Sequence, residues 1–160
     1  PKHMESLSAK LIEMGADVSI YEDAIEVRCN DRLKASNIKT MPYPGFPTDL
    51  QPQIAVLLSI CEGTSLISEG VWENRYQYVD ELKKMGANIK VEGRLAIIEG
   101  VEELQGSEVV AVDLRAGAAL IVAGLAAKGK TAIYNTKNVD RGYEKIDQKL
   151  KNLGAKVFRV

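Results

Sequence analysis

The sequence predicts a mixed α/β fold (α+β type) in which one unit of strands and helices is repeated around buried helices. Three observations support this fold class. The end of an amphipathic helix, followed by a glycine and an alternating strand, occurs three times, at 10–20, 81–91 and 149–160. The copies lie roughly 70 residues apart, a spacing that indicates a unit of several elements and not a solenoid turn. Between them, the apolar segments 50–62 and 114–128 have the character of buried helices.

The first unit, residues 1–39, is expected to be incomplete. It opens with a helix that ends before Gly15, and a strand follows. A glycine directly after the last periodic residue is the usual left-handed helix cap, and Gly86 and Gly154 stand at the matching places of the other units. The strand and buried helix that open those units have no counterpart here. We therefore expect the chain to be a piece of a longer protein.

The second unit, residues 40–100, contains every expected element. Its apolar helix, 50–62, can be capped by Thr48 or Asp49, and Pro52 lies in the first turn, where a missing N–H is tolerated. The elements after this helix are expected to be a strand, a surface helix and two strands that meet around Gly93, at 64–71, 74–86, 88–93 and 94–100.

The third unit, residues 101–160, repeats this order. Its helix 114–128 is apolar nearly all round and contains Gly117 and Gly124, so we expect it to be buried against close neighbours. The other elements are expected at strand 108–113, strand 131–136, helix 142–154 and strand 156–160. The three units together are expected to form a single domain, 1–160, long enough to bury a sizeable core.

Composition argues against several classes of function. A net charge of −1 without a basic stripe argues against nucleic acid as a partner. The uncharged run 116–127 is too short to span a bilayer, so no membrane partner is expected. No metal-ligand spacing, Cys–His or Ser–His arrangement or phosphate-binding glycine loop is present, and we expect neither a metal nor a cofactor. Cys29 and Cys61 are expected to be reduced, packed thiols of a cytoplasmic protein.

Asp49 is the first candidate for chemistry. It follows MPYPGFPT, whose three prolines and one glycine indicate a rigid loop that presents a side chain. Asp49 can be a helix cap, worth about 1 kcal/mol, or a base. The cap is less needed because Thr48 can cap the helix itself, with Gln51 completing a capping box, and Asp113 recurs at the matching place. Helix amides lower the pKa of such a carboxylate, and a bound anion would raise it again.

Three arginines accompany these aspartates. Arg75 and Arg141 stand at matching helix starts of two units, and Arg115 follows Asp113 closely. Arginine binds phosphate and carboxylate groups through two parallel hydrogen bonds, and helix starts bind anions through free amides. The alternative is local ion pairing, of Asp113 with Arg115 and of Asp140 or Glu144 with Arg141. The repeated order of aspartate and arginine indicates a site that handles an anionic substrate and moves a proton.

Long stretches around these residues resemble one family. The matching motifs cover essentially the whole chain and are PYPGFPTDLQ, ENRY followed by VDELKKMGA, DLRAGAALIVAGLAAKG and VDRGYEKIDQKLKNLGA. In them the chain resembles the UDP-N-acetylglucosamine 1-carboxyvinyltransferase family of enolpyruvyl transferases, which opens peptidoglycan synthesis and so serves cell wall biogenesis and cell shape. The resemblance implies an inverse α/β-barrel-like domain of βαβαββ units. It places this chain in one of two such domains, the one that holds the C-terminal part.

The resemblance also implies a reaction and residue roles. Members transfer enolpyruvate from phosphoenolpyruvate to the 3-hydroxyl of UDP-N-acetylglucosamine and release phosphate, in a cleft between the two domains. Asp49 would take the hydroxyl proton, Arg141 would move onto phosphoenolpyruvate as the cleft closes, and Val71 would contact the sugar nucleotide. The remaining substrate-binding residues that the resemblance implies are Arg75, Asp113 and Arg115.

Two other readings stay open. A 3-phosphoshikimate 1-carboxyvinyltransferase uses the same chemistry on a different anionic sugar acid, and a non-catalytic binding or assembly module can keep the same fold. Asp49 and the three arginines argue against the module, since a degenerate copy would lose some of them. The family's catalytic cysteine or aspartate loop belongs to the other domain. The chain alone is therefore expected to be inactive, and to self-associate through an exposed apolar groove and strand edge.

Overall fold

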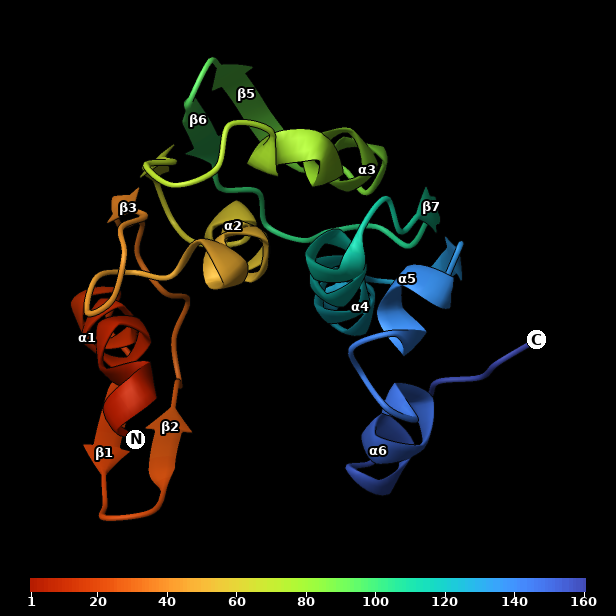
Figure 1. Cartoon of the computed structure of the whole chain (residues 1–160), viewed down its shortest axis with the longest axis horizontal. Helices are drawn as coiled ribbons and strands as arrows, with labels where there is room; N and C mark the ends of the chain where they lie inside the picture. The colour runs from red at the N-terminus through yellow and green to blue at the C-terminus, as the bar shows by residue number, and fades with distance from the viewer.

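The computed structural model describes all 160 residues, and its elements form an arch of three groups (Figure 1). The chain runs along one limb, crosses the top and continues into the other limb, so that the two termini lie on opposite sides of the arch. One limb is the first unit of the sequence, the top belongs to the second unit, and the other limb is the third. The predicted mixed α/β class is confirmed.

The first group is a helix beside a two-stranded hairpin. The 3-10 turn η1 (Lys2–Met4) leads into α1 (Glu5–Glu13), and Gly15, with a φ of +101°, ends the helix as predicted. The antiparallel strands β1 (Asp17–Ile20) and β2 (Ile25–Arg28) pair only with each other.

The second group holds a four-stranded sheet in the order β3–β4–β6–β5, in which only β3 and β4 run parallel. The helix α2 packs against β4 and β6, and α3 packs against β5. The two predicted strands around Gly93 form an antiparallel hairpin. The bounds are β3 (Ile38–Lys39), η2 (Thr48–Leu50), α2 (Gln51–Ser59), β4 (Thr64–Ser68), η3 (Arg75–Tyr78), α3 (Val79–Lys84), β5 (Asn88–Glu92) and β6 (Leu95–Glu99).

The third group follows the same order at its start. A parallel pair of strands lies beside the long helix α4, and two shorter helices follow. The bounds are β7 (Glu108–Val110), α4 (Leu114–Ala126), β8 (Ala132–Tyr134), α5 (Lys137–Asp140) and α6 (Ile146–Asn152).

Two expectations about the third unit are wrong. The predicted helix 142–154 is shorter, at α6, and the separate helix α5 precedes it, so that Arg141 lies just after a helix and not at a helix start. The predicted strand 156–160 forms no ladder. Its counterpart in the second unit is β5, which pairs only with β6, and residues 1–160 contain no third-unit strand in the place of β6. A strand without a partner leaves its backbone groups to solvent.

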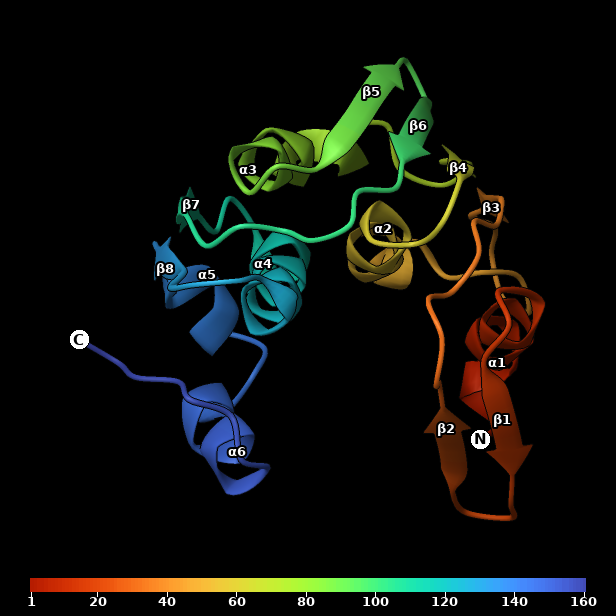
Figure 2. The ribbon, with the colours of Figure 1, turned by 180° about the vertical axis from the view of Figure 1, so that it is seen from behind.

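The core centres on α2 and α4, which pack side by side (Figures 1 and 2). Seven of the nine residues of α2 are buried, as the apolar segment predicted. On α4 one side is buried, whereas Val122 and Leu125 on the other are 43% and 48% exposed, so this helix is less enclosed than expected. Gly117 has the close neighbour that was predicted, because an added Cβ would lie 2.3 Å from Cγ2 of Val139.

The two cysteines lie in different environments. Cys61 is buried in the core as expected, and burial raises the pKa of its thiol to about 11. Cys29 is exposed, which contradicts the expectation of a packed thiol. It follows β2 at the end of a two-stranded hairpin that packs against α1, and its side chain lies at the surface. No helix of the chain combines the length and apolar character needed to cross a membrane.

Candidate functional site

Asp49 stands at the end of a closed loop. Residues 40–47 fold back on themselves, with the N–H of Met41 donating to the carbonyl of Phe46 at 3.0 Å. The side chain of Phe46 is buried in the core and anchors the loop. The turn η2 then carries Asp49 directly into α2. The proline-rich segment before Asp49 is therefore closed by a backbone hydrogen bond and anchored in the core by Phe46.

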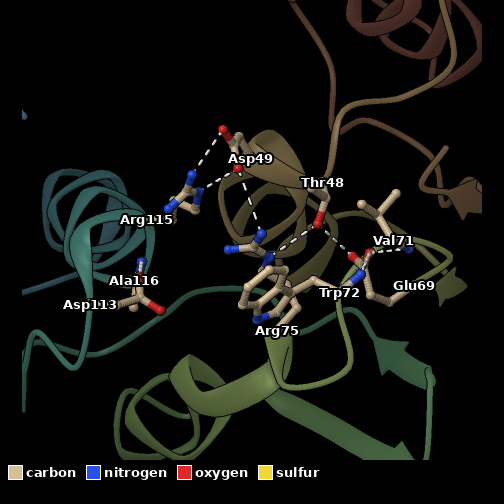
Figure 3. A network of polar contacts seen from close by, with 9 residues as sticks. All are labelled: Thr48, Asp49, Glu69, Val71, Trp72, Arg75, Asp113, Arg115 and Ala116. Atoms are coloured by element: carbon tan, nitrogen blue, oxygen red, sulfur yellow. Dashed lines mark hydrogen bonds and ion pairs between the residues drawn. The ribbon is translucent and has the colours of Figure 1, made fainter. Parts of the chain in front are cut away.

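Two arginines from different units converge on Asp49 (Figure 3). Arg115, in the first turn of α4, donates from Nε to Oδ1 of Asp49 and from Nη2 to Oδ2 at 3.1 Å. Arg75, the first residue of η3, places Nη2 at 3.6 Å from the same Oδ1. Arg75 is 8% exposed, whereas the Asp49 side chain is 59% exposed. The carboxylate thus lies at the surface, in contact with one guanidinium that is nearly buried and one that is more open.

The arginines determine the protonation of this carboxylate. The hydrogen bonds from Arg115 are the largest influence and hold the pKa of Asp49 below its ordinary value. Partial burial acts in the opposite direction, and the charges of Arg115 and Arg75 lower the pKa further. The same contact raises the pKa of Arg115. In this arrangement Asp49 is ionised and paired with the two arginines. Its pKa rises, and it becomes a stronger base, when the guanidiniums bind another anion.

A second chain of hydrogen bonds runs from Arg75 into the protein (Figure 3). Nε of Arg75 donates to Oγ1 of Thr48 at 3.0 Å, and the Thr48 hydroxyl donates to Oε2 of Glu69 at 3.0 Å. Oε1 of Glu69 accepts the N–H groups of Val71 and Trp72 at 2.9 and 3.0 Å. The Arg75 guanidinium also lies 5.7 Å from the centre of the Trp72 ring, a cation–π distance.

The other predicted residues lie in different positions. Asp113 caps α4, accepting the N–H of Ala116 at 2.8 Å. Val71 follows β4 and is 41% exposed. Arg141 follows α5; it is exposed, and its side chain makes no hydrogen bond or ion pair within the chain. Asp49, Arg75 and Arg115 are therefore brought into contact, whereas Arg141 is not part of this cluster.

The local alternatives weighed from the sequence are not realised. Neither Thr48 nor Asp49 caps α2, because η2 extends the helix start and Leu50 occupies the cap position without a side-chain bond. Arg115 pairs with Asp49, 66 residues away, and not with the adjacent Asp113. Asp140 pairs with Arg159 and not with Arg141.

Sequence reasoning missed Glu69 as part of the network. A signal was present: in β4 the buried side chains are Ser65 and Ile67, and continuing this alternation by two residues places Glu69 on the buried face. Glu69 is 1% exposed. A carboxyl group at an inward position needs donors around it, and the Thr48 hydroxyl and two backbone N–H groups supply them.

Comparisons with known proteins agree with one another. The family profile of EPSP synthase (3-phosphoshikimate 1-carboxyvinyltransferase) matches residues 1–150. UDP-N-acetylglucosamine 1-carboxyvinyltransferase of Clostridium botulinum is 55% identical over all 160 residues, which correspond to 38% of that protein. The protein of that name from Desulfofundulus thermocisternus is 58% identical over all 160 residues, 66% of its length.

Solved structures show the same relationship. The enolpyruvyl transferase NikO from Streptomyces tendae superposes with a TM-score of 0.86 at 30% identity, over 95% of this chain and 35% of its own. EPSP synthase from Acinetobacter baumannii, at 21% identity and a TM-score of 0.72, shares the fold. The chain spans 38% of the length of the Clostridium botulinum relative. The resemblance in the sequence motifs is thus confirmed, and the chain belongs to the enolpyruvyl (1-carboxyvinyl) transferase family.

Proposed function

We propose that this chain forms one wall of the active site of a transferase that moves enolpyruvate from phosphoenolpyruvate to the 3-hydroxyl of UDP-N-acetylglucosamine. The contact of Asp49 with Arg75 and Arg115 carries this proposal. It joins a carboxylate suited to accept a proton with two guanidiniums suited to bind an anion. The names of the relatives at 55% and 58% identity support this choice of acceptor.

The pairing of Asp49 with Arg75 and Arg115 provides a way to raise the pKa of the base when substrate binds. Phosphoenolpyruvate carries a carboxylate and a phosphate, and either group competes with Asp49 for the two guanidiniums. An anion at that place withdraws hydrogen bonds from Asp49 and adds a negative charge beside it, and both changes raise its pKa. As Asp49 accepts the proton of the sugar 3-hydroxyl, the hydroxyl oxygen bonds to C2 of phosphoenolpyruvate, and the electron pair of the C2=C3 double bond takes up a proton at C3. C3 then gives up a proton and the double bond forms again as the C2–O bond to phosphate breaks. Phosphate leaves with the bonding electrons and takes up the proton that Asp49 accepted.

The other residues have supporting roles in this proposal. Arg141 is exposed and free of partners within the chain, so it can move onto phosphoenolpyruvate. Val71 offers an exposed apolar contact for the sugar nucleotide, beside the network that ends on Glu69. Asp113 keeps the first turn of α4 capped and so fixes the backbone that carries Arg115. The second wall, with the cysteine or aspartate loop, comes from the other domain of a cytoplasmic enzyme of peptidoglycan synthesis.

The test uses a hybrid enzyme in which these 160 residues replace the matching segment of the Clostridium botulinum relative. Phosphate release is measured with phosphoenolpyruvate and either UDP-N-acetylglucosamine or 3-phosphoshikimate as acceptor. We expect phosphate release with UDP-N-acetylglucosamine as acceptor and none with 3-phosphoshikimate. Turnover with 3-phosphoshikimate would favour the activity in the name of the matching family profile. An inactive hybrid that folds and binds neither acceptor would contradict both.

A further inference from the structure

Glu69 is a buried carboxyl group to which the reaction proposed above gives no role. It lies at the end of β4, 1% exposed, and all three of its hydrogen bonds are donated to it. Two come from the backbone of residues 71 and 72, and one comes from the Thr48 hydroxyl. Burying a carboxyl group only to end a strand would cost free energy without a return, since an amide or an apolar side chain avoids the burial of a charge.

The direction of the hydrogen bonds gives Glu69 a connection to the site. Thr48 has one proton to donate, and it donates this proton to Oε2 of Glu69. Its oxygen is then free to accept Nε–H of Arg75. Because a hydroxyl that donates to a carboxylate is a stronger acceptor, the two bonds reinforce each other. The order is therefore Arg75 to Thr48 to Glu69, and the far side of Arg75 faces Asp49.

Glu69 also constrains Arg75 from a second side. By accepting the N–H groups of Val71 and Trp72 it fixes the backbone after β4. The Trp72 ring then lies 5.7 Å from the Arg75 guanidinium. Arg75 is thus held through its Nε by Thr48 and by a cation–π contact with Trp72, and Glu69 supports both neighbours. The free Nη2 is left to face Oδ1 of Asp49.

We propose that Glu69 is a positioning residue, which acts through Thr48 and the backbone of residues 71 and 72 to hold Arg75 against Asp49. The geometry of this proposal stands on the chain alone; its consequence for catalysis rests on the proposed function. The position of the Arg75 guanidinium then depends on Glu69, a group that does not contact the substrate. Misplacement of a binding group by about 1 Å can cost up to 100-fold in rate, so the effect is measurable.

The test separates the Thr48 branch from the backbone branch. Thr48→Val removes the hydroxyl at nearly constant shape and leaves Glu69 bonded to residues 71 and 72, whereas Thr48→Ser restores the hydroxyl. Glu69→Gln replaces one carboxylate oxygen, a hydrogen-bond acceptor, with an NH2 group, which is a donor. Glu62→Gln, at an exposed glutamate whose side chain makes no hydrogen bond or ion pair, is the control for the loss of one carboxylate. The titration of the Asp49 carboxyl and the Nε–H signal of Arg75 are followed by NMR in the hybrid enzyme without substrates.

Arg75 of η3 and Arg115 of α4 are the charged groups that face Asp49. Release of Arg75 removes a favourable charge, so Thr48→Val and Glu69→Gln are expected to raise the Asp49 midpoint, while Thr48→Ser and Glu62→Gln leave it in place. In the hybrid enzyme, Thr48→Val is expected to lower kcat by about tenfold, within the range for a displaced group, and Thr48→Ser is expected to rescue it.

An Asp49 midpoint and an Arg75 signal that are the same in Thr48→Val and Thr48→Ser would overturn the positioning proposal, whatever the kinetics show. A shifted midpoint with unchanged kinetics would support the positioning of Arg75. The same result would contradict the proposed roles of Asp49 and Arg75 in the reaction. If Glu69→Gln does not fold, Glu69→Asp takes its place, because it keeps the carboxylate but shortens its reach to Thr48. An Asp49 midpoint that is unchanged in Glu69→Asp would overturn the role given to Glu69.

Discussion

Asp49→Asn is the sharpest test of the proposed chemistry. The substitution keeps the size of the side chain and one hydrogen-bond acceptor, and removes the charge and the ability to take a proton. In the structure Asp49 is 59% exposed and makes no cap, so its folded-state role is confined to its contacts with Arg115 and Arg75. Exposed ion pairs of this kind contribute about 0–1 kcal/mol to stability.

The expected effects on stability and on rate therefore differ widely. A loss of about 1 kcal/mol at most lowers Tm by only a few degrees in a domain of this size. Loss of a general base lowers turnover by about 100-fold or more. Sugar-nucleotide binding should stay within about tenfold, because the amide still offers a hydrogen bond to the 3-hydroxyl.

The assay is steady-state phosphate release by the hybrid enzyme with saturating UDP-N-acetylglucosamine and phosphoenolpyruvate, alongside thermal unfolding of the same preparation. A control variant, Glu62→Gln, removes a carboxylate elsewhere on the surface. A kcat within a few-fold of the parent hybrid would refute Asp49 as the base and leave it only the task of holding the two arginines.

Three further predictions concern the arginines and the chain alone. Arg141→Ala should mainly weaken the use of phosphoenolpyruvate in the hybrid, and Arg141→Lys should restore it only in part, because an ammonium cannot form the two parallel bonds of a guanidinium; unchanged apparent affinity with lowered Tm would show a structural role. Arg115→Ala should raise the Asp49 pKa. In the parent the lowered pKa stabilises the folded state above about pH 4, and this contribution is lost as the pH falls through the folded-state pKa. Urea unfolding at pH 7 and pH 3 should therefore show a smaller loss of stability on acidification in the variant than in the parent, and equal losses would contradict the pairing. The 160-residue chain alone should show no transferase activity, and calorimetry should show weak or absent binding of UDP-N-acetylglucosamine. It should form dimers or larger species in light scattering, because Val122, Leu125 and Phe158 are exposed. Micromolar binding by a monomer would contradict this prediction.

Local pattern was sufficient for most elements of the fold. The glycines after α1 and α3 and at the β5–β6 turn adopt the positive φ that their places in the sequence required. The apolar segment of α2 is buried, and the alternating strands of the second unit pair as a sheet. Periodicity and caps are short-range properties, so a sequence read alone reveals them. The segment 156–160 has the same alternation and forms no strand, because a ladder needs a partner that a pattern cannot supply.

The candidate site divides in the same way. Sequence alone identified Asp49, Arg75 and Arg115 as candidates, since their types and repeated places were visible in the chain. Only the tertiary structure decided their partners: Asp49 reaches Arg115 across 66 residues, and Thr48 turns away from the helix to join Arg75 to Glu69. Local pairs such as Asp113 with Arg115 were equally consistent with the sequence. The choice between them depended on the packing of α2 beside α4, which brings two helix starts to one place and is a property of the folded core.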